Sequence, residues 1–311
     1  MAQFITNFTT VFIQVLILFA LMGFGFAGSK TGIITKEGSK VMSDIVMYFV
    51  TPCLIINSFN IEFDNEHLHG LIICLIAFLS IMIGSALLAH AVFRGKDANK
   101  TKVLRFAVVF SNTGYMGIPL QKAVLGNEGV FYGSVCVALF NIVLWTYGLV
   151  CMSGDKKSLS IKKLILNPGV IGVIIGIIVF MAPVSLPSPV ASIVDSMASL
   201  NTPMAMMVIG FNLAGSPIAA AFKDKSLYLV SFLRLVAIPV IALFALVLCG
   251  IRGEILTSVV IASSAPVAAA TTIFSIKFEA DVKTSVNLVA ITTLMSIVTM
   301  SAIVALAQLF Q

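Results

Sequence analysis

Two short stretches of the sequence place hydrogen-bonding side chains beside helix-breaking residues in apolar surroundings. They are SNTGYMGIPL, with Asn112, Thr113, Gly114, Tyr115, Gly117 and Pro119, and ASSAPVAAATT, with Ser263, Ser264 and Pro266. Proline lacks a backbone N–H and clashes with the preceding helical turn, and glycine makes unwinding cheap. Backbone groups freed inside a membrane are tolerated only next to protein or a water-filled cavity. We therefore expect each stretch to break a helix and to line a cavity.

Together the two breaks predict a site for an anion. A new half-helix is expected to begin near Ile118 and another near Pro266, each capped by a preceding Ser or Thr. A helix N-terminus carries about half a positive charge and unpaired N–H groups, so two of them at one cavity favour a carboxylate. The Asn112 amide and the hydroxyls of both stretches would add donors. Proline and glycine also kink membrane helices that bind nothing, and this alternative stays open for either break alone.

The elements that must position these residues are membrane spans. Of the 311 residues, 59% are hydrophobic and 10% are charged, and the mean hydropathy is +1.09. Because a bilayer core needs about 20 mostly apolar residues per helix, the sequence predicts an all-α integral membrane protein. Its ten predicted spans lie at roughly 8–27, 41–60, 70–93, 103–123, 130–151, 165–183, 190–214, 227–249, 255–276 and 284–309.

The distribution of basic residues predicts the orientation of the chain in the cell membrane. The formal net charge is +6. Most Lys and Arg residues lie in the loops after the odd-numbered spans, whereas the opposite loops contain only Lys122 and Arg252. Because basic loops stay cytoplasmic, we expect both termini on the extracytoplasmic side. The positive charge is explained in this way, and no nucleic acid is expected as a partner.

An internal repeat is predicted to relate the two halves of the chain. At an offset of 151 residues Asp44 falls on Asp195, and the Thr-Pro pair that begins at Thr51 falls on the pair that begins at Thr202. The same offset superimposes the fourth span on the ninth. Since five spans are an odd number, the second half enters the membrane from the other side, which gives an inverted repeat. The predicted units are a first repeat at 1–151, a cytoplasmic linker at 152–164 and a second repeat at 165–311.

Further polar residues in the spans are candidates for ion coupling or for the walls of the cavity. They are Asp44, Asp195, Asn141, Asn287, Thr292 and Arg234. Carboxylates in membranes often bind a coupling H⁺ or Na⁺, although a capping or interface role is the alternative here. Arg234 is expected to extend to the cytoplasmic surface, or else to hold a substrate carboxylate. The Asn and Thr side chains could bind Na⁺ or join helices by hydrogen bonds. No cofactor or resident metal is expected.

A family resemblance is carried by the fourth span and by the last two. NTGYMGIPL and SSAPVAAATTIFSIKFEADVKTSVNLVAITTLMSIVT resemble the auxin efflux carrier family, which includes the plant PIN auxin exporters and bacterial malate or malonate permeases. The resemblance implies a five-plus-five inverted repeat, like that of NhaA and of bile-acid transporters, in which spans 4 and 9 cross at their prolines. It also implies a scaffold of spans 1, 2, 6 and 7, a transport domain of spans 3–5 and 8–10, and a homodimer. Asn112 and Pro119 match the family's first motif, whereas the ninth span has no Asn.

These features predict a secondary transporter of small organic anions, with malate-type or malonate-type mono- and dicarboxylates as first choice. Transport would follow an elevator-like alternating access. An auxin-like or other weak acid is an alternative substrate, although the chain lacks the long cytoplasmic loop of many plant members. The alternative from another class is a receptor that binds a carboxylate at the same crossing without moving it. No HExxH or GxxxxGK[ST] motif is present, so enzymatic activity is not expected.

Overall fold

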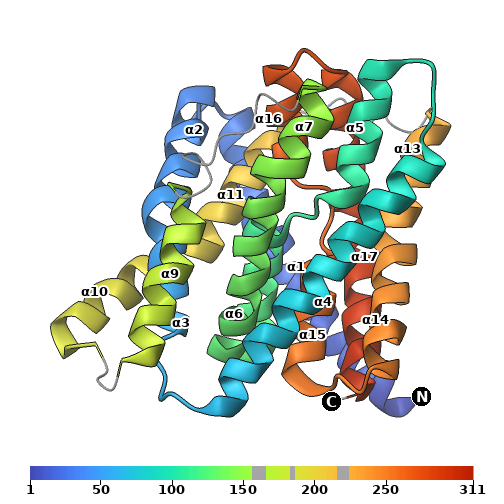
Figure 1. Ribbon diagram of the computed structural model, residues 1–311. Helices are drawn as coiled ribbons and strands as arrows, with labels where there is room; N and C mark the ends of the chain where they lie inside the picture. Colours follow the sequence, from blue (N-terminus) through green and yellow to red (C-terminus); the bar gives the residue numbers. More distant parts are fainter. Residues whose placement is uncertain (156–165, 183–185, 216–223, 311) are drawn as a thin grey trace.

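Helices make up the protein throughout the residues that the computed structural model describes, which are 1–155, 166–182, 186–215 and 224–310 (Figure 1). Within these ranges the backbone is paired in extended form only at one isolated bridge. Seven of the described helices are long and apolar enough to cross a membrane. The predicted all-α membrane architecture is therefore confirmed, whereas the count of ten spans and the inverted repeat stay predictions.

Short π-helical or 3₁₀ turns, labelled η, connect several of the helices. The described elements of the first half are α1 (Ala2–Lys30), α2 (Lys36–Ile45), η1 (Val46–Val50), α3 (Thr51–Ser58), α4 (Asn65–Val92), α5 (Ala98–Val109), η2 (Thr113–Gly117), α6 (Ile118–Val143), η3 (Leu144–Gly148) and α7 (Leu149–Ser153). Those of the second half are α9 (Pro168–Met181), α10 (Ser188–Ser199), α11 (Asn201–Ala214), α13 (Lys225–Phe232), η5 (Leu233–Ala237), α14 (Ile238–Leu248), α15 (Gly253–Ser264), α16 (Ala270–Lys277), α17 (Val282–Ala307) and η6 (Gln308–Phe310).

Three predicted spans do not form separate long helices. The sixth predicted span corresponds to α9, a helix of 14 residues. The fourth and the ninth are each divided by a non-helical segment, between α5 and η2 and between α15 and α16. The second part of the fourth span is continuous with the fifth over 41 residues, Thr113–Ser153, with a kink at Gly126, where φ is 68°. The breaks in the fourth and ninth predicted spans and the continuous helix Thr113–Ser153 account for part of the difference from ten.

Close packing joins α1 to α11. A Cβ atom added to Gly25 would lie 2.0 Å from the carbonyl oxygen of Met207, and one added to Gly210 would lie 1.9 Å from that of Met22. Glycine at both positions lets the two backbones approach. These helices belong to predicted spans 1 and 7, which the resemblance assigns to the scaffold. The division into scaffold and transport domain stays a prediction.

Both chain termini lie at one end of the helix bundle (Figure 1). The turn between α4 and α5 lies at the other end, as do the start of α2 and the end of α7. The predicted linker at 152–164 falls mostly outside the described residues. Which side of the membrane each end faces stays a prediction from the basic loops.

Candidate functional site

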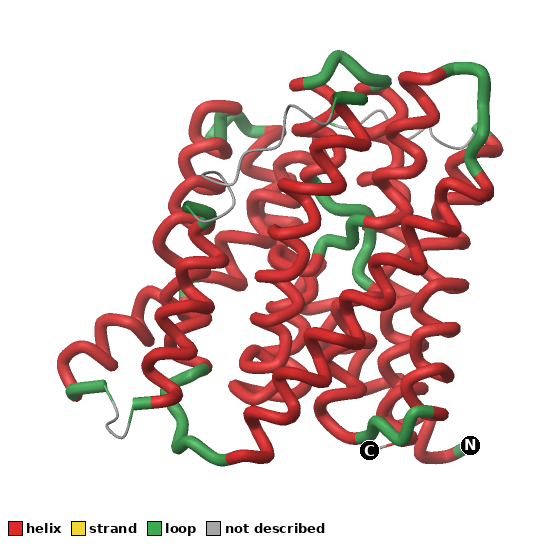
Figure 2. The backbone as a smooth tube through the Cα atoms, in the orientation of Figure 1, coloured by secondary structure: helices red, strands yellow, loops and turns green. Residues whose placement is uncertain are grey.

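Two interrupted helices meet in the interior of the bundle. Helix α5 ends at Val109 and the chain becomes helical again at Thr113, whereas α15 ends at Ser264 and the next helix begins at Ala270. Figure 2 shows the two non-helical segments crossing deep inside the molecule. Almost all of their residues are buried. The polar backbone of these segments must therefore find its partners within the protein.

The two segments supply hydrogen-bond partners to each other. Ser111 and Val267 form an antiparallel bridge. The flanking backbone bonds run from the N–H of Asn112 to the carbonyl of Pro266 over 2.7 Å and from the N–H of Ala268 to the carbonyl of Phe110 over 2.9 Å. This short ladder satisfies backbone groups that would otherwise be unpaired in the membrane interior. The fourth and ninth predicted spans thus cross where the sequence places SNTGYMGIPL opposite ASSAPVAAATT.

Of the two half-helices after the crossing, the first contains the predicted start and the second begins later than expected. The first begins as the π-helical turn Thr113–Gly117, so that Pro119 lies in the first turn of α6, where a missing N–H costs little. The second begins at Ala270. Helix α6 begins at Ile118, the predicted position, directly after this π-helical turn. The predicted start near Pro266 is wrong, because the chain stays extended through the bridge at Val267 and enters α16 only after Ala268.

Both half-helices have N-termini without a side-chain cap. Asn112 precedes η2 and Ala269 precedes α16, and neither end receives a capping bond from a side chain. Open space adjoins the first end, since a Cβ added to Gly114 would meet no atom within 4 Å. Backbone carbonyls occupy part of each end, since the N–H of Thr113 donates to Ser111 over 2.8 Å and that of Thr271 donates to Ala268 over 2.9 Å. A helix N-terminus without a side-chain cap beside open space is a feature of anion sites.

The side-chain donors of the crossing are engaged to different degrees. Ser263 donates to the carbonyl of Val260 over 3.0 Å, and Ser264 donates to that of Ile261 over 3.2 Å. Both serines end α15 and do not form the expected cap on the next half-helix, whereas their role as donors to an anion stays a prediction. The Thr113 hydroxyl is paired with the Ser111 hydroxyl at 3.0 Å. Asn112, with 5% of its surface exposed, lies two residues before Gly114, where the open space begins.

Arg234 joins the C-terminal ends of the two helices that enter the crossing. Its side chain, 2% exposed, comes from η5. Nη1 donates to the carbonyl of Val108 over 3.0 Å, and Nη2 donates to the carbonyl of Ser263. The expected extension of Arg234 to the cytoplasmic surface is wrong, because the guanidinium is held by carbonyls at the ends of α5 and α15. One positive charge therefore offsets two helix ends that each carry about half a negative charge.

Two of the other candidates lie beside the crossing. The Thr292 hydroxyl accepts from the N–H of Val267 over 3.1 Å and donates to the carbonyl of Leu288 over 2.6 Å, so α17 supports the bridge. Tyr115 donates through its hydroxyl to the carbonyl of Ser43 over 3.4 Å, which brings the neighbouring Asp44 toward this region.

The remaining candidates are placed elsewhere. Asn141 accepts from the Nδ2 of Asn167 over 3.1 Å, a bond between predicted spans 5 and 6. Asp195 is exposed on α10 and accepts from the Nδ2 of Asn57 over 3.1 Å. Helix α10 lies at the edge of the bundle (Figure 1). Asn287 is buried in α17, and its Oδ1 has no partner among the described residues.

Sequence reasoning did not bring together one group of titratable residues, which come from the N-terminal end of α4, from α6 and from the start of α15. His67 Nε2 lies 3.4 Å from Glu128 Oε1, and the other ring nitrogen of His67 contacts Asp64. Glu254, the second residue of α15, adjoins Glu128, and burial together with that carboxylate raises the pKa of Glu254 to about 7. Because these residues come from three distant parts of the chain, no local sequence motif predicts that they lie together.

Comparisons with known proteins find similarity along nearly the whole chain. The family model for membrane transport proteins matches residues 10–304. An uncharacterized transporter of Methanocaldococcus jannaschii is 27% identical over 290 residues, which cover 90% of this chain and 93% of that protein. An uncharacterized transporter of Methanothermobacter thermautotrophicus is 25% identical over 285 residues, which cover 88% and 90%. The resemblance to the auxin efflux carrier family is thereby confirmed.

Proposed function

We propose that this chain, which belongs to the membrane transport protein family, is a secondary transporter that moves small organic anions across the cell membrane. Mono- and dicarboxylates of the malate or malonate type are the proposed substrates. The carboxylate would bind at the crossing, near Asn112, Gly114 and Tyr115. A coupling H⁺ or Na⁺ and a homodimer are further parts of the proposal, which rest on the family resemblance.

The observation that carries this proposal is the charge arrangement at the crossing. Four helix ends meet there, and the two negative ends are offset by Arg234 through Val108 and Ser263. The two positive ends, at Thr113 and Ala270, have no side-chain cap. Taken together, the buried charges leave an excess of positive potential at the uncapped ends. Such a site favours an anion over a metal cation.

Movement of the substrate is proposed to follow from displacement of spans 3–5 and 8–10 against spans 1, 2, 6 and 7. Two of the described hydrogen bonds between these groups are Tyr115 to Ser43 and Asn167 to Asn141. Each is a single neutral bond, worth about 1 kcal/mol net. Bonds of this strength can break and reform in an alternating-access cycle.

The decisive experiment compares binding with flux in reconstituted vesicles. Wild-type protein is expected to exchange labelled malate or malonate in counterflow, and Asn112→Ala should weaken binding about tenfold to hundredfold, the effect of losing one hydrogen bond to a charged group. Asn127→Ala, at an exposed position of α6 beside the kink at Gly126, is the control. Binding without counterflow would favour the receptor alternative. Absence of binding across a panel of carboxylates would contradict the proposed substrate class.

A further inference from the structure

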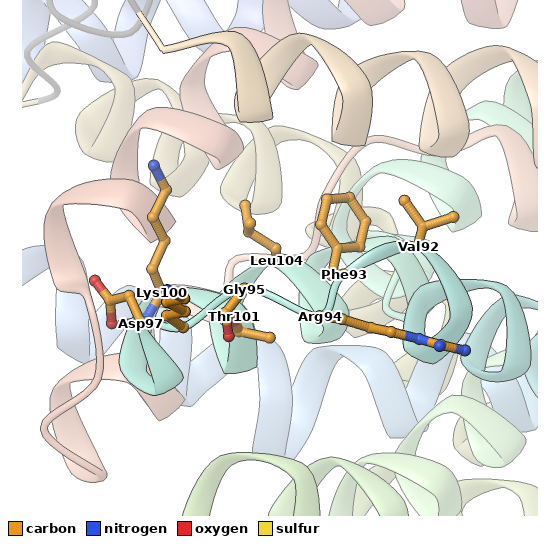
Figure 3. Close-up of a pocket in the computed structure, with 9 residues that line it drawn as sticks. Val92, Phe93, Arg94, Gly95, Asp97, Lys100, Thr101 and Leu104 are labelled. Carbon is orange, nitrogen blue, oxygen red and sulfur yellow. Dashed lines mark hydrogen bonds between the residues drawn. The ribbon is translucent and has the colours of Figure 1, made fainter.

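A cavity lies away from the crossing, at the turn between α4 and α5. It has a volume of about 300 Å³. Figure 3 shows its walls, which are formed by Val92, Phe93, Arg94, Gly95, Lys96, Asp97, Lys100, Thr101 and Leu104. The turn lies at the rim of the bundle, at the end opposite the termini (Figure 1). From the distribution of basic loops, this end is expected to meet the cytoplasmic leaflet.

The cavity combines an excess of positive charge with an apolar wall. Three of its lining residues are cationic, and the one acidic lining residue, Asp97, caps α5 by accepting from the N–H of Lys100 over 3.1 Å. Phe93 and Leu104 are buried beneath the rim, while Val92 is 40% exposed toward the surroundings of α4. A soluble anion needs only the charges. An amphipathic anion would use both the cationic rim and the apolar wall.

The cavity also adjoins an ion pair that connects two helices leading to the crossing. Lys100 Nζ lies 2.6 Å from the Asp224 carboxylate. Lys100 is in the first turn of α5, which ends at the carbonyls that Arg234 binds, and Asp224 caps α13, which continues into the turn that contains Arg234. A ligand that binds Lys100 beside Asp224 would therefore contact the ion pair that joins α5 to α13, the two helices that lead to Arg234.

We propose that this cavity binds the phosphate of an anionic phospholipid from the adjoining leaflet. Arg94, which extends away from Lys100 in Figure 3, swings back at the rim to contact the phosphate together with Lys96. Lys100 is shared between the phosphate and Asp224, and the glycerol and first acyl carbons lie against Val92 and Phe93. Basic clusters at a membrane surface attract anionic lipids by about 1 kcal/mol per cation, which is about fivefold in affinity. This inference does not depend on which solute passes the crossing.

The test is a titration of the purified full chain in neutral detergent with dihexanoyl phosphatidylglycerol. Binding is measured as the change in the thermal unfolding temperature. Dihexanoyl phosphatidylcholine and glycerol 3-phosphate are the comparison ligands. The variant is the double substitution Arg94→Gln and Lys96→Gln. The matched control is Lys36→Gln with Lys40→Gln, two exposed cations on α2 at the same end of the molecule.

The expected result is stabilisation of wild type and control by phosphatidylglycerol, with an apparent affinity about 25-fold lower in the double variant. An equal effect of phosphatidylcholine would overturn the proposal, because the headgroup charge would then be irrelevant. An equal effect of glycerol 3-phosphate would assign the cavity to soluble phosphate esters instead. A double variant that responds like the control would place the lipid at another surface.

Discussion

Arg234 Nη1 donates a hydrogen bond to the backbone carbonyl of Val108 over 3.0 Å, although the two residues lie 126 positions apart. The same guanidinium donates to Ser263, so one side chain holds both helices that enter the crossing. Lysine could place a charge there, but its compact ammonium group lacks the planar fork that reaches two separate carbonyls. The charge and the geometry of Arg234 can therefore be tested separately.

Replacement of Arg234 is expected to destabilise the protein. Arg234→Gln should lower the free energy of unfolding by about 1.5–3 kcal/mol for each charged hydrogen bond that glutamine does not replace. Arg234→Lys should retain more stability and part of the carboxylate binding, since the charge opposite the helix ends remains. Denaturant unfolding and ligand titration of both variants in detergent provide the measurements.

A matched control for Arg234 is Arg252, which also donates to backbone carbonyls, those of Val247 and Ile251, but is exposed. Arg252→Gln should change the free energy of unfolding by less than about 0.5 kcal/mol, as for other surface substitutions. Equal effects of Arg234→Gln and Arg252→Gln would show that the buried bonds at the crossing contribute little.

The contact of α1 with α11 gives a prediction about glycine. Gly210→Ala should lower the free energy of unfolding by about 1–3 kcal/mol, because the new methyl group would overlap the Met22 carbonyl and the helices must separate. Gly23→Ala, two residues before Gly25 on α1, is the control, since its Cβ would meet no atom within 4 Å. It should be neutral or slightly stabilising, because alanine favours a helix. A thermal unfolding series distinguishes the two outcomes.

The sequence predicted the crossing but not its detailed geometry. Proline, glycine and the 151-residue offset mark where two apolar spans are interrupted, because these residue types act on the local backbone. They do not reveal that Asn112 would pair with Pro266 through the backbone, since that pairing depends on how distant helices pack. For the same reason the start of the second half-helix was predicted near Pro266, whereas α16 begins at Ala270.

Arg234 shows the same limit for a side chain. A basic residue about seven positions into an apolar run is ordinarily taken to extend to the nearest surface. Its partners are the carbonyls of Val108 and Ser263, on two other helices. These carbonyls are free to accept from Arg234 only because the two helices end there. Side-chain roles that depend on backbone breaks elsewhere in the chain cannot be assigned before the packing is known.

The open space beside Gly114 allows a substitution that separates folding from binding. Gly114→Ala should leave the unfolding temperature nearly unchanged, because its Cβ would meet no neighbouring atom within 4 Å. The methyl group would project into the space where the carboxylate is proposed to bind, so substrate affinity should fall. Gly117→Ala is the control, since its Cβ would make ordinary contacts, the nearest at 3.6 Å to Thr113. Equal affinities in the two variants would contradict the proposed position of the anion.

The pair of Glu128 and Glu254 predicts a pH dependence of stability. Because burial and Glu128 raise the pKa of Glu254 from 4.5 to about 7, the folded protein keeps a proton that the unfolded chain releases at lower pH. Stability from this group is therefore complete below about pH 4.5 and is lost as the pH rises through 7. Glu254→Gln cannot ionise, so its unfolding temperature should fall less than that of wild type between about pH 5 and pH 8. Glu62→Gln, in the exposed loop before α4, should retain the wild-type slope. Parallel slopes for wild type and Glu254→Gln would show that the carboxyl pair does not share a proton.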